Sequence, residues 1–144
     1  MLTLAAQDSE DLQVISARLQ DAVARVQDLV WLPQAHRFAA MFNRFKWEST
    51  ESKGAALRVR AGICFENVLS AKSHNIRSDN PEAVLSLLAV TFESNGPEDP
   101  SGTVELVFSG GGTLRLNVEC LDSTLSDVSA DWAARHRPNH PLET

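Results

Sequence analysis

The sequence predicts a single α+β domain, mainly an antiparallel curled sheet or partial barrel of about seven strands, with an N-terminal helix and a C-terminal helix. Three observations lead to this fold class. The length of 144 residues is typical of one domain. Several segments alternate apolar and polar residues, as half-buried antiparallel strands require. Strands do not alternate with long helical segments, so a parallel sheet is not expected.

A short leading strand and an amphipathic helix are expected first. Asp8 can act as the helix N-cap, because its side-chain oxygen can accept a free backbone amide of the first turn. The apolar residues that follow share one helical face: Leu12, Ile15, Leu19 and Ala22. Residues 23–32 and 37–47 then suggest two strands joined by a turn at Pro33. In the second strand the apolar residues change face near Asn43, which predicts a β-bulge or burial on both sides.

The clearest single strand covers residues 57–66. One face of this strand is apolar, with Leu57, Val59, Ala61, Ile63 and Phe65. The opposite face carries Arg58, Arg60, Gly62, Cys64 and Glu66. Residues 68–76 and 84–93 are expected to form further strands, with loops at 77–82 and 94–102.

The C-terminal part is expected to hold a hairpin and a helix. Residues 103–121 alternate on either side of Gly110–Gly112, where glycine allows the positive φ of a tight turn. A turn centred on Gly111 would place Glu105 near Asn117 and Arg115 on the outer face. Three apolar residues with helical spacing mark the last predicted helix, namely Leu125, Val128 and Trp132.

Short connections between these strands favour a meander that curls to hide its edges. Together with the closing helix, this arrangement resembles the pleckstrin-homology-like architecture. An open antiparallel sheet with helices on one face is the alternative. We expect residues 1–135 to form the globular domain and residues 136–144 to form a flexible tail, because the tail is polar and rich in proline and histidine.

Charge is distributed unevenly along the chain. The formal net charge is −6, which alone argues weakly against an anionic partner such as a nucleic acid. Residues 31–78 nevertheless carry a net charge of +5, between flanking segments of −3 and −8. The candidate anion- or partner-binding residues in this basic segment are Arg44, Lys46, Trp47, Arg58 and Arg60. The same pattern also suits an ordinary polar sheet face that acidic strands neutralise.

Catalytic and cofactor signals are weak. No G-x-S-x-G or H-E-x-x-H motif is present, and the Gly110–Gly112 run precedes a strand rather than the helix that a phosphate loop needs. Pro138 lies between His136 and His140, so a regular helical metal site is not expected there. We expect no catalytic residue, no metal and no cofactor.

The location is inferred from the same sequence. The N-terminus lacks the basic leader and apolar core of a secretory signal. No apolar run approaches the roughly 20 residues of a membrane helix. The two cysteines are too few for a disulfide scaffold. A cytoplasmic protein with no membrane partner is therefore expected.

Two stretches carry a resemblance to a known family. They are LQDAVARVQDLVWLPQAHRFAAMFNRFKWE (residues 19–48) and VELVFSGGGTLRLNVECLDSTLSDV (residues 104–128). Both resemble an uncharacterised family of short alphaproteobacterial proteins, number 2948 among the domains of unknown function. The resemblance implies a stand-alone bacterial cytoplasmic protein. It implies no activity, cofactor or site residue, so Asn43, Arg44, Trp47 and Gly110 remain motif positions without a role.

Three functional hypotheses follow. The first is a non-enzymatic binding module whose basic-aromatic residues, or an exposed strand edge, hold an acidic or peptide partner. The second is a small-molecule-binding protein or enzyme with a site at the barrel mouth, where Arg44 and His74 would supply polar groups. The third is weak RNA binding, which would depend steeply on salt. The sequence leaves the oligomeric state open.

Overall fold

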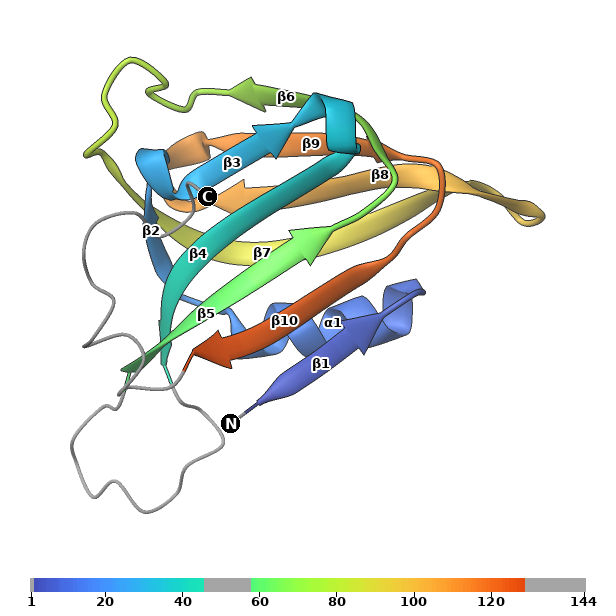
Figure 1. Cartoon of the computed structure of the whole chain (residues 1–144), viewed down its shortest axis with the longest axis horizontal. Coiled ribbons are helices and arrows are strands. Elements are labelled where there is room, and N and C mark those ends of the chain that lie inside the picture. The colour runs from blue at the N-terminus through green and yellow to red at the C-terminus, as the bar shows by residue number, and fades with distance from the viewer. Residues whose placement is uncertain (1, 46–57, 129–144) are drawn as a thin grey trace.

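The computed structural model of the chain describes residues 2–45 and 58–128 (Figure 1). Within these residues the chain forms one α-helix and ten strands, all paired antiparallel in one sheet. This confirms the prediction of a mainly antiparallel sheet, although the predicted number of about seven strands was too low. The sheet is not closed into a barrel, because β1 and β6 stand at its two ends.

The elements follow one another from β1 to β10. The first half consists of β1 (Thr3–Ala6), α1 (Ser9–Arg18), β2 (Val23–Arg25), β3 (Leu29–Leu32), β4 (Arg37–Phe45) and β5 (Arg58–Phe65). The second half consists of β6 (Val68–His74), β7 (Val84–Gly96), β8 (Asp99–Phe108), β9 (Thr113–Val118) and β10 (Ser123–Val128). No helix in the part of the chain that the structure describes is long and apolar enough to cross a membrane.

The strand order is β1-β10-β5-β4-β2-β7-β8-β9-β6, and β3 pairs with β4 beside β2. The predicted meander is therefore correct for the sequential pairs β3–β4, β4–β5, β7–β8 and β8–β9, and wrong elsewhere. The predicted strand over residues 23–32 is interrupted by a 3₁₀ turn (Val26–Asp28). The Asp28 carboxylate accepts the backbone amide of Arg25 at 3.1 Å, and this contact holds the turn.

One hydrophobic core lies between the two halves of the curled sheet (Figure 1). Inward-facing residues of β4 and β8 contribute Phe38, Ala40, Phe42, Val104, Leu106 and Phe108. Helix α1 packs against β1 and β7 and buries its predicted apolar face. Asp8 is its N-cap, as predicted, because an oxygen of its carboxylate accepts the Asp11 amide at 2.8 Å.

The predicted C-terminal helix is wrong where the structure can test it, because Ser123–Val128 is strand β10. This strand pairs with β1 on one side and β5 on the other, with Leu125 opposite both Leu4 and Ile63. Pairing on both edges outweighs the helical spacing of three apolar residues. Trp132 and the proposed domain boundary at residue 135 lie outside the described residues. A pleckstrin-homology-like arrangement stays a prediction.

The predicted bulge near Asn43 is also wrong, because β4 pairs with β5 from Phe38 to Phe45 without a register shift. The loop expected at 94–102 is mostly hairpin, since β7 runs to Gly96 and β8 starts at Asp99. The hairpin between β8 and β9 is confirmed, with Glu105 opposite Arg115 and positive φ at Gly110 and Gly111.

Candidate functional site

Arg44 is a buried residue of the core, not a residue of an exposed anion site. It lies on the inner face of β4 beyond Phe42, and its side chain is 0% exposed. Its Nε and Nη2 donate to the two carboxylate oxygens of Asp127 on β10, at 2.9 and 2.8 Å, and its Nη1 donates to the Phe45 carbonyl. A buried guanidinium needs such a partner, because an unpaired charge in the core is strongly unfavourable. This corrects the prediction that placed Arg44 among the anion-binding residues.

The Arg44–Asp127 ion pair connects three strands. Asp127 also accepts the backbone amide of Leu2, just before β1, at 3.0 Å. Strand β5 lies between β4 and β10 in the sheet, so the ion pair spans it on the core side. The pair is therefore a structural element that joins β4, β10 and the start of the chain.

Arg58 and Arg60 lie on the outer face of β5, as the alternation predicts. Arg58 is opposite Phe45 on β4, and its guanidinium carbon lies 4.3 Å from the centroid of that ring. This is a cation–π contact, which orients the guanidinium. Arg60 is opposite Asn43 on β4 and Val128 on β10, so its strand neighbours carry no charge.

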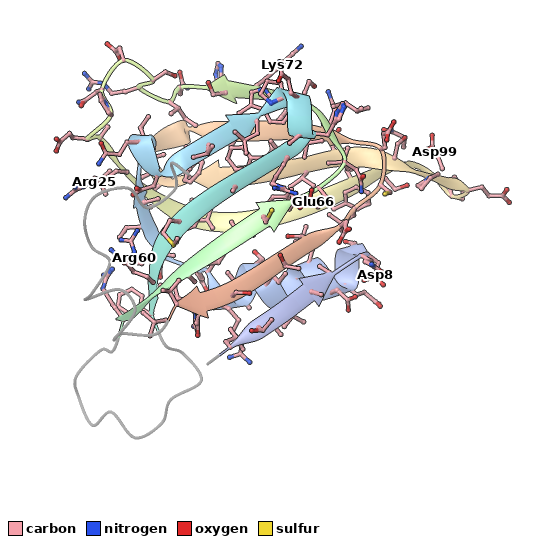
Figure 2. The ribbon with its side chains drawn as sticks, viewed as in Figure 1. Asp8, Arg25, Arg60, Glu66, Lys72 and Asp99 are labelled. Atoms are coloured by element: carbon pink, nitrogen blue, oxygen red, sulfur yellow. The ribbon has the colours of Figure 1, made fainter. Side chains whose placement is uncertain are left out.

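A third arginine belongs to the same face. Val23 of β2 pairs with Asn43, while Ala24 is buried at 5% exposure, so alternation turns Arg25 to the outside. Figure 2 shows Arg25 and Arg60 on the same side of the molecule. We call the set Arg25, Asn43, Phe45, Arg58 and Arg60 the arginine face. Arg25 is absent from the sequence-based candidates because only the non-local pairing of β2 with β4 brings it here.

Several other arginines of the described residues are neutralised. Arg37 pairs with Glu66 at 2.9 Å, and Arg115 pairs with Glu105 at 3.1 Å. Among the described residues, no carboxylate forms an ion pair with Arg58 or Arg60. The other two predicted site residues, Lys46 and Trp47, lie outside the residues that the structure describes, so their roles stay predictions.

A cleft of about 330 Å³ lies at the other end of the molecule, between the start of α1 and the β7–β8 hairpin. Its lining residues are Gln7, Asp8, Ser9, Phe92, Ser94, Asp99, Pro100, Cys120 and Leu121. Figure 2 shows Asp8 and Asp99 at this end, away from Arg25 and Arg60. Hydrogen bonds from the Ser101 hydroxyl and amide lower the pKa of Asp99. Among these lining residues, none is a basic residue or a histidine that could activate a nucleophile.

The two residues predicted to supply polar groups at a barrel mouth, Arg44 and His74, lie in different surroundings. Arg44 is buried against Asp127, and His74 is exposed at the end of β6, so the structure does not bring them together. Neither residue lines the cleft. The physical reason is that Arg44 follows the inward alternation of β4, which directs it to the core rather than to an opening.

Cys64 is not activated by its arginine neighbours. Burial, followed by the hydrogen bond to Glu66 at 3.4 Å, raises the pKa of the Cys64 thiol to about 11. The thiol is therefore protonated at neutral pH and is a poor nucleophile. Within residues 2–45 and 58–128, no group of three or more His, Cys, Asp or Glu side chains is placed to hold a metal ion. His136 and His140 lie outside these ranges.

Comparison with known families gives one match. The model of a family described as "Protein of unknown function (DUF2948)" matches residues 2–140. The match includes both stretches on which the resemblance was based and all five residues of the arginine face. No curated protein and no solved structure is significantly similar to the chain.

Proposed function

We propose that this chain, which belongs to the DUF2948 family of proteins of unknown function, is a non-enzymatic binding module that holds an acidic partner on its arginine face. One observation carries the proposal. Arg58 and Arg60 stand on an outer sheet face with no ion-pair partner among the described residues. In contrast, Arg37, Arg44 and Arg115 are each paired with a carboxylate.

The chemistry of this face suits anions. A guanidinium presents a planar fork of donors that matches a carboxylate or phosphate in a two-point contact. The Phe45 ring holds the Arg58 guanidinium in place, which reduces the conformational entropy lost on binding. The Asn43 amide beside Arg60 can add a neutral hydrogen bond to the same ligand.

Two features favour binding over catalysis. The residues that line the cleft include no histidine, lysine or arginine, and the core between the sheet halves is filled by apolar side chains such as Phe42, Phe65 and Phe108. The arginine face lies on the outer side of the sheet rather than in the cleft. A bacterial cytoplasmic setting is part of the proposal and rests on the sequence alone.

The proposal can be tested with fluorescein-labelled poly-L-glutamate and fluorescence anisotropy. The variant Arg58→Gln/Arg60→Gln should weaken binding roughly tenfold, because two charge-assisted contacts are lost. The matched control is Lys72→Gln/Arg77→Gln, which removes the same charge from two exposed residues outside the arginine face. Equal affinities of the two variants would refute the proposal.

A further inference from the structure

We propose that the arginine face selects an extended acidic peptide whose two carboxylates stand at positions i and i+2. This inference rests on the proposed function of the same face and specifies its partner. The argument comes from the spacing and the surroundings of Arg58 and Arg60 on β5.

The spacing of these arginines equals the repeat of an extended chain. Arg58 and Arg60 are alternate residues of a regular strand, so their Cα atoms are about 6.6 Å apart. An extended peptide has the same rise per residue, so side chains at i and i+2 point to one side with the same separation. A peptide aligned with β5 therefore presents two carboxylates at the spacing of the two arginine Cα atoms.

Strand addition is not available at this position. Strand β5 is paired with β4 along its whole length and with β10 from Arg60 to Phe65, so over the latter residues its backbone cannot accept a further strand. Contacts to a ligand must come from the outward side chains. Specificity then depends on where the arginine side chains stand, and the Phe45 ring fixes Arg58 in its position.

The correspondence between outward arginines of β5 and carboxylates of the peptide ends after two positions. The next outward position along β5 is Gly62, where the nearest atoms to an added Cβ would belong to Met41. Its neighbour on β10 is Ser126, which is also uncharged. A third carboxylate at i+4 would therefore meet no cation there. A ligand therefore needs only two carboxylates, at positions i and i+2, to contact both arginines.

A peptide fits this face better than a single-stranded nucleic acid. Stacking of bases needs an accessible aromatic ring, and the ring of Phe45 is already in contact with Arg58. The Asp28 carboxylate, which accepts the Arg25 amide, limits the positive potential on the β2 side.

The test compares two eight-residue peptides of identical composition, one containing Glu-Val-Glu and the other Glu-Glu-Val. Adjacent side chains of an extended chain point to opposite sides, so only the first peptide can reach both arginines. Titration of the full chain, followed through the NMR signals of the Arg58 and Arg60 Nε–H groups, should give roughly fivefold tighter binding for Glu-Val-Glu. The variant Arg60→Gln should abolish this preference.

The outcomes separate this inference from the proposed function. Equal affinity for the two peptides, with poly-L-glutamate still bound through Arg58 and Arg60, would overturn the spacing rule alone. Loss of all response to poly-L-glutamate at these arginines would overturn the proposed function as well. Tighter binding of a single-stranded oligo-dT of matched charge would overturn the choice of a peptide.

Discussion

The guanidinium of Arg44 and the carboxylate of Asp127 form a two-point ion pair that is shielded from solvent, with side-chain exposures of 0% and 3%. This pair fixes β4 relative to β10 across the intervening strand. Arg44 is thereby neutralised inside the core. The candidates for binding are Arg58 and Arg60, which face outwards from β5 and form no ion pair with a described residue.

Removing one member of this pair should be strongly destabilising. Arg44→Met leaves the Asp127 carboxylate buried without its partner, so the free energy of unfolding should fall by about 3–5 kcal/mol in a urea titration. The double variant Arg44→Met/Asp127→Leu should recover much of this loss, because no buried charge is left. A single variant within about 1 kcal/mol of the parent chain would contradict the assigned role.

A buried serine and a half-buried serine should respond differently to the loss of their hydroxyls. The Ser123 hydroxyl is buried and has no hydrogen-bond partner among the described residues, so Ser123→Ala should be neutral or slightly stabilising. The Ser16 hydroxyl accepts the Val90 amide at 2.9 Å, so Ser16→Ala should cost about 1–2 kcal/mol. Thermal unfolding measures the loss of stability in both variants. A larger loss of stability for Ser123→Ala than for Ser16→Ala would contradict the roles given to the two hydroxyls.

Gly102 should tolerate no side chain. A Cβ there would lie 2.7 Å from the Phe92 ring and would also clash with the Glu93 carbonyl oxygen. We expect Gly102→Ala to lower stability by about 1–3 kcal/mol in chemical denaturation. Gly96→Ala, in the same hairpin with its nearest contact at 3.8 Å, is the matched control. Similar losses in the two variants would exclude crowding as the cause.

The Cys64 thiol should react slowly with iodoacetamide at pH 8. Burial and the Glu66 carboxylate raise its pKa to about 11, so the reactive thiolate is scarce. Because the pKa of the Cys64 thiol is higher in the folded chain than in the unfolded chain, the thiol contributes to the free energy of unfolding below its ordinary pKa. That contribution is lost as the pH rises towards 11.

Mass spectrometry in a Cys120→Ser background would isolate this reaction. The alkylation rate should rise with a midpoint near pH 11. Glu66→Gln should shift the midpoint to lower pH, because it removes a negative charge beside the thiol. A midpoint at the ordinary thiol value of about 8.5 in the parent chain would show that the thiol is not perturbed.

Local periodicity was sufficient to predict the elements that depend on local sequence. The helix after Asp8, the inner and outer faces of β5 and the turn at Gly110–Gly111 follow from it. Strand β10 was assigned to a helix because its pairing partners, β1 and β5, lie far away in the sequence. Such long-range pairing cannot be read from a single segment.

Only part of the candidate site could be predicted, because the rest of it depends on pairing between strands that are distant in the sequence. The alternation of Phe38, Ala40 and Phe42 already pointed Arg44 inwards, but the apolar residues Phe45 and Trp47 suggested a change of face near Asn43. Arg25 was missed because it joins the site only through the pairing of β2 with β4. Arg58 and Arg60 were found because alternation within one strand places them outside.

The central claim is that Arg58 and Arg60, which face outwards and form no ion pair with a described residue, bind an acidic partner. The most direct measurement is the affinity of Arg58→Glu/Arg60→Glu for labelled poly-L-glutamate at constant salt, beside the charge-matched variant Lys72→Glu/Arg77→Glu. The arginine face predicts loss of measurable binding in the first variant and a change of only a few-fold in the second. Binding that weakens equally in both variants, as a uniform effect of net charge would require, contradicts the claim.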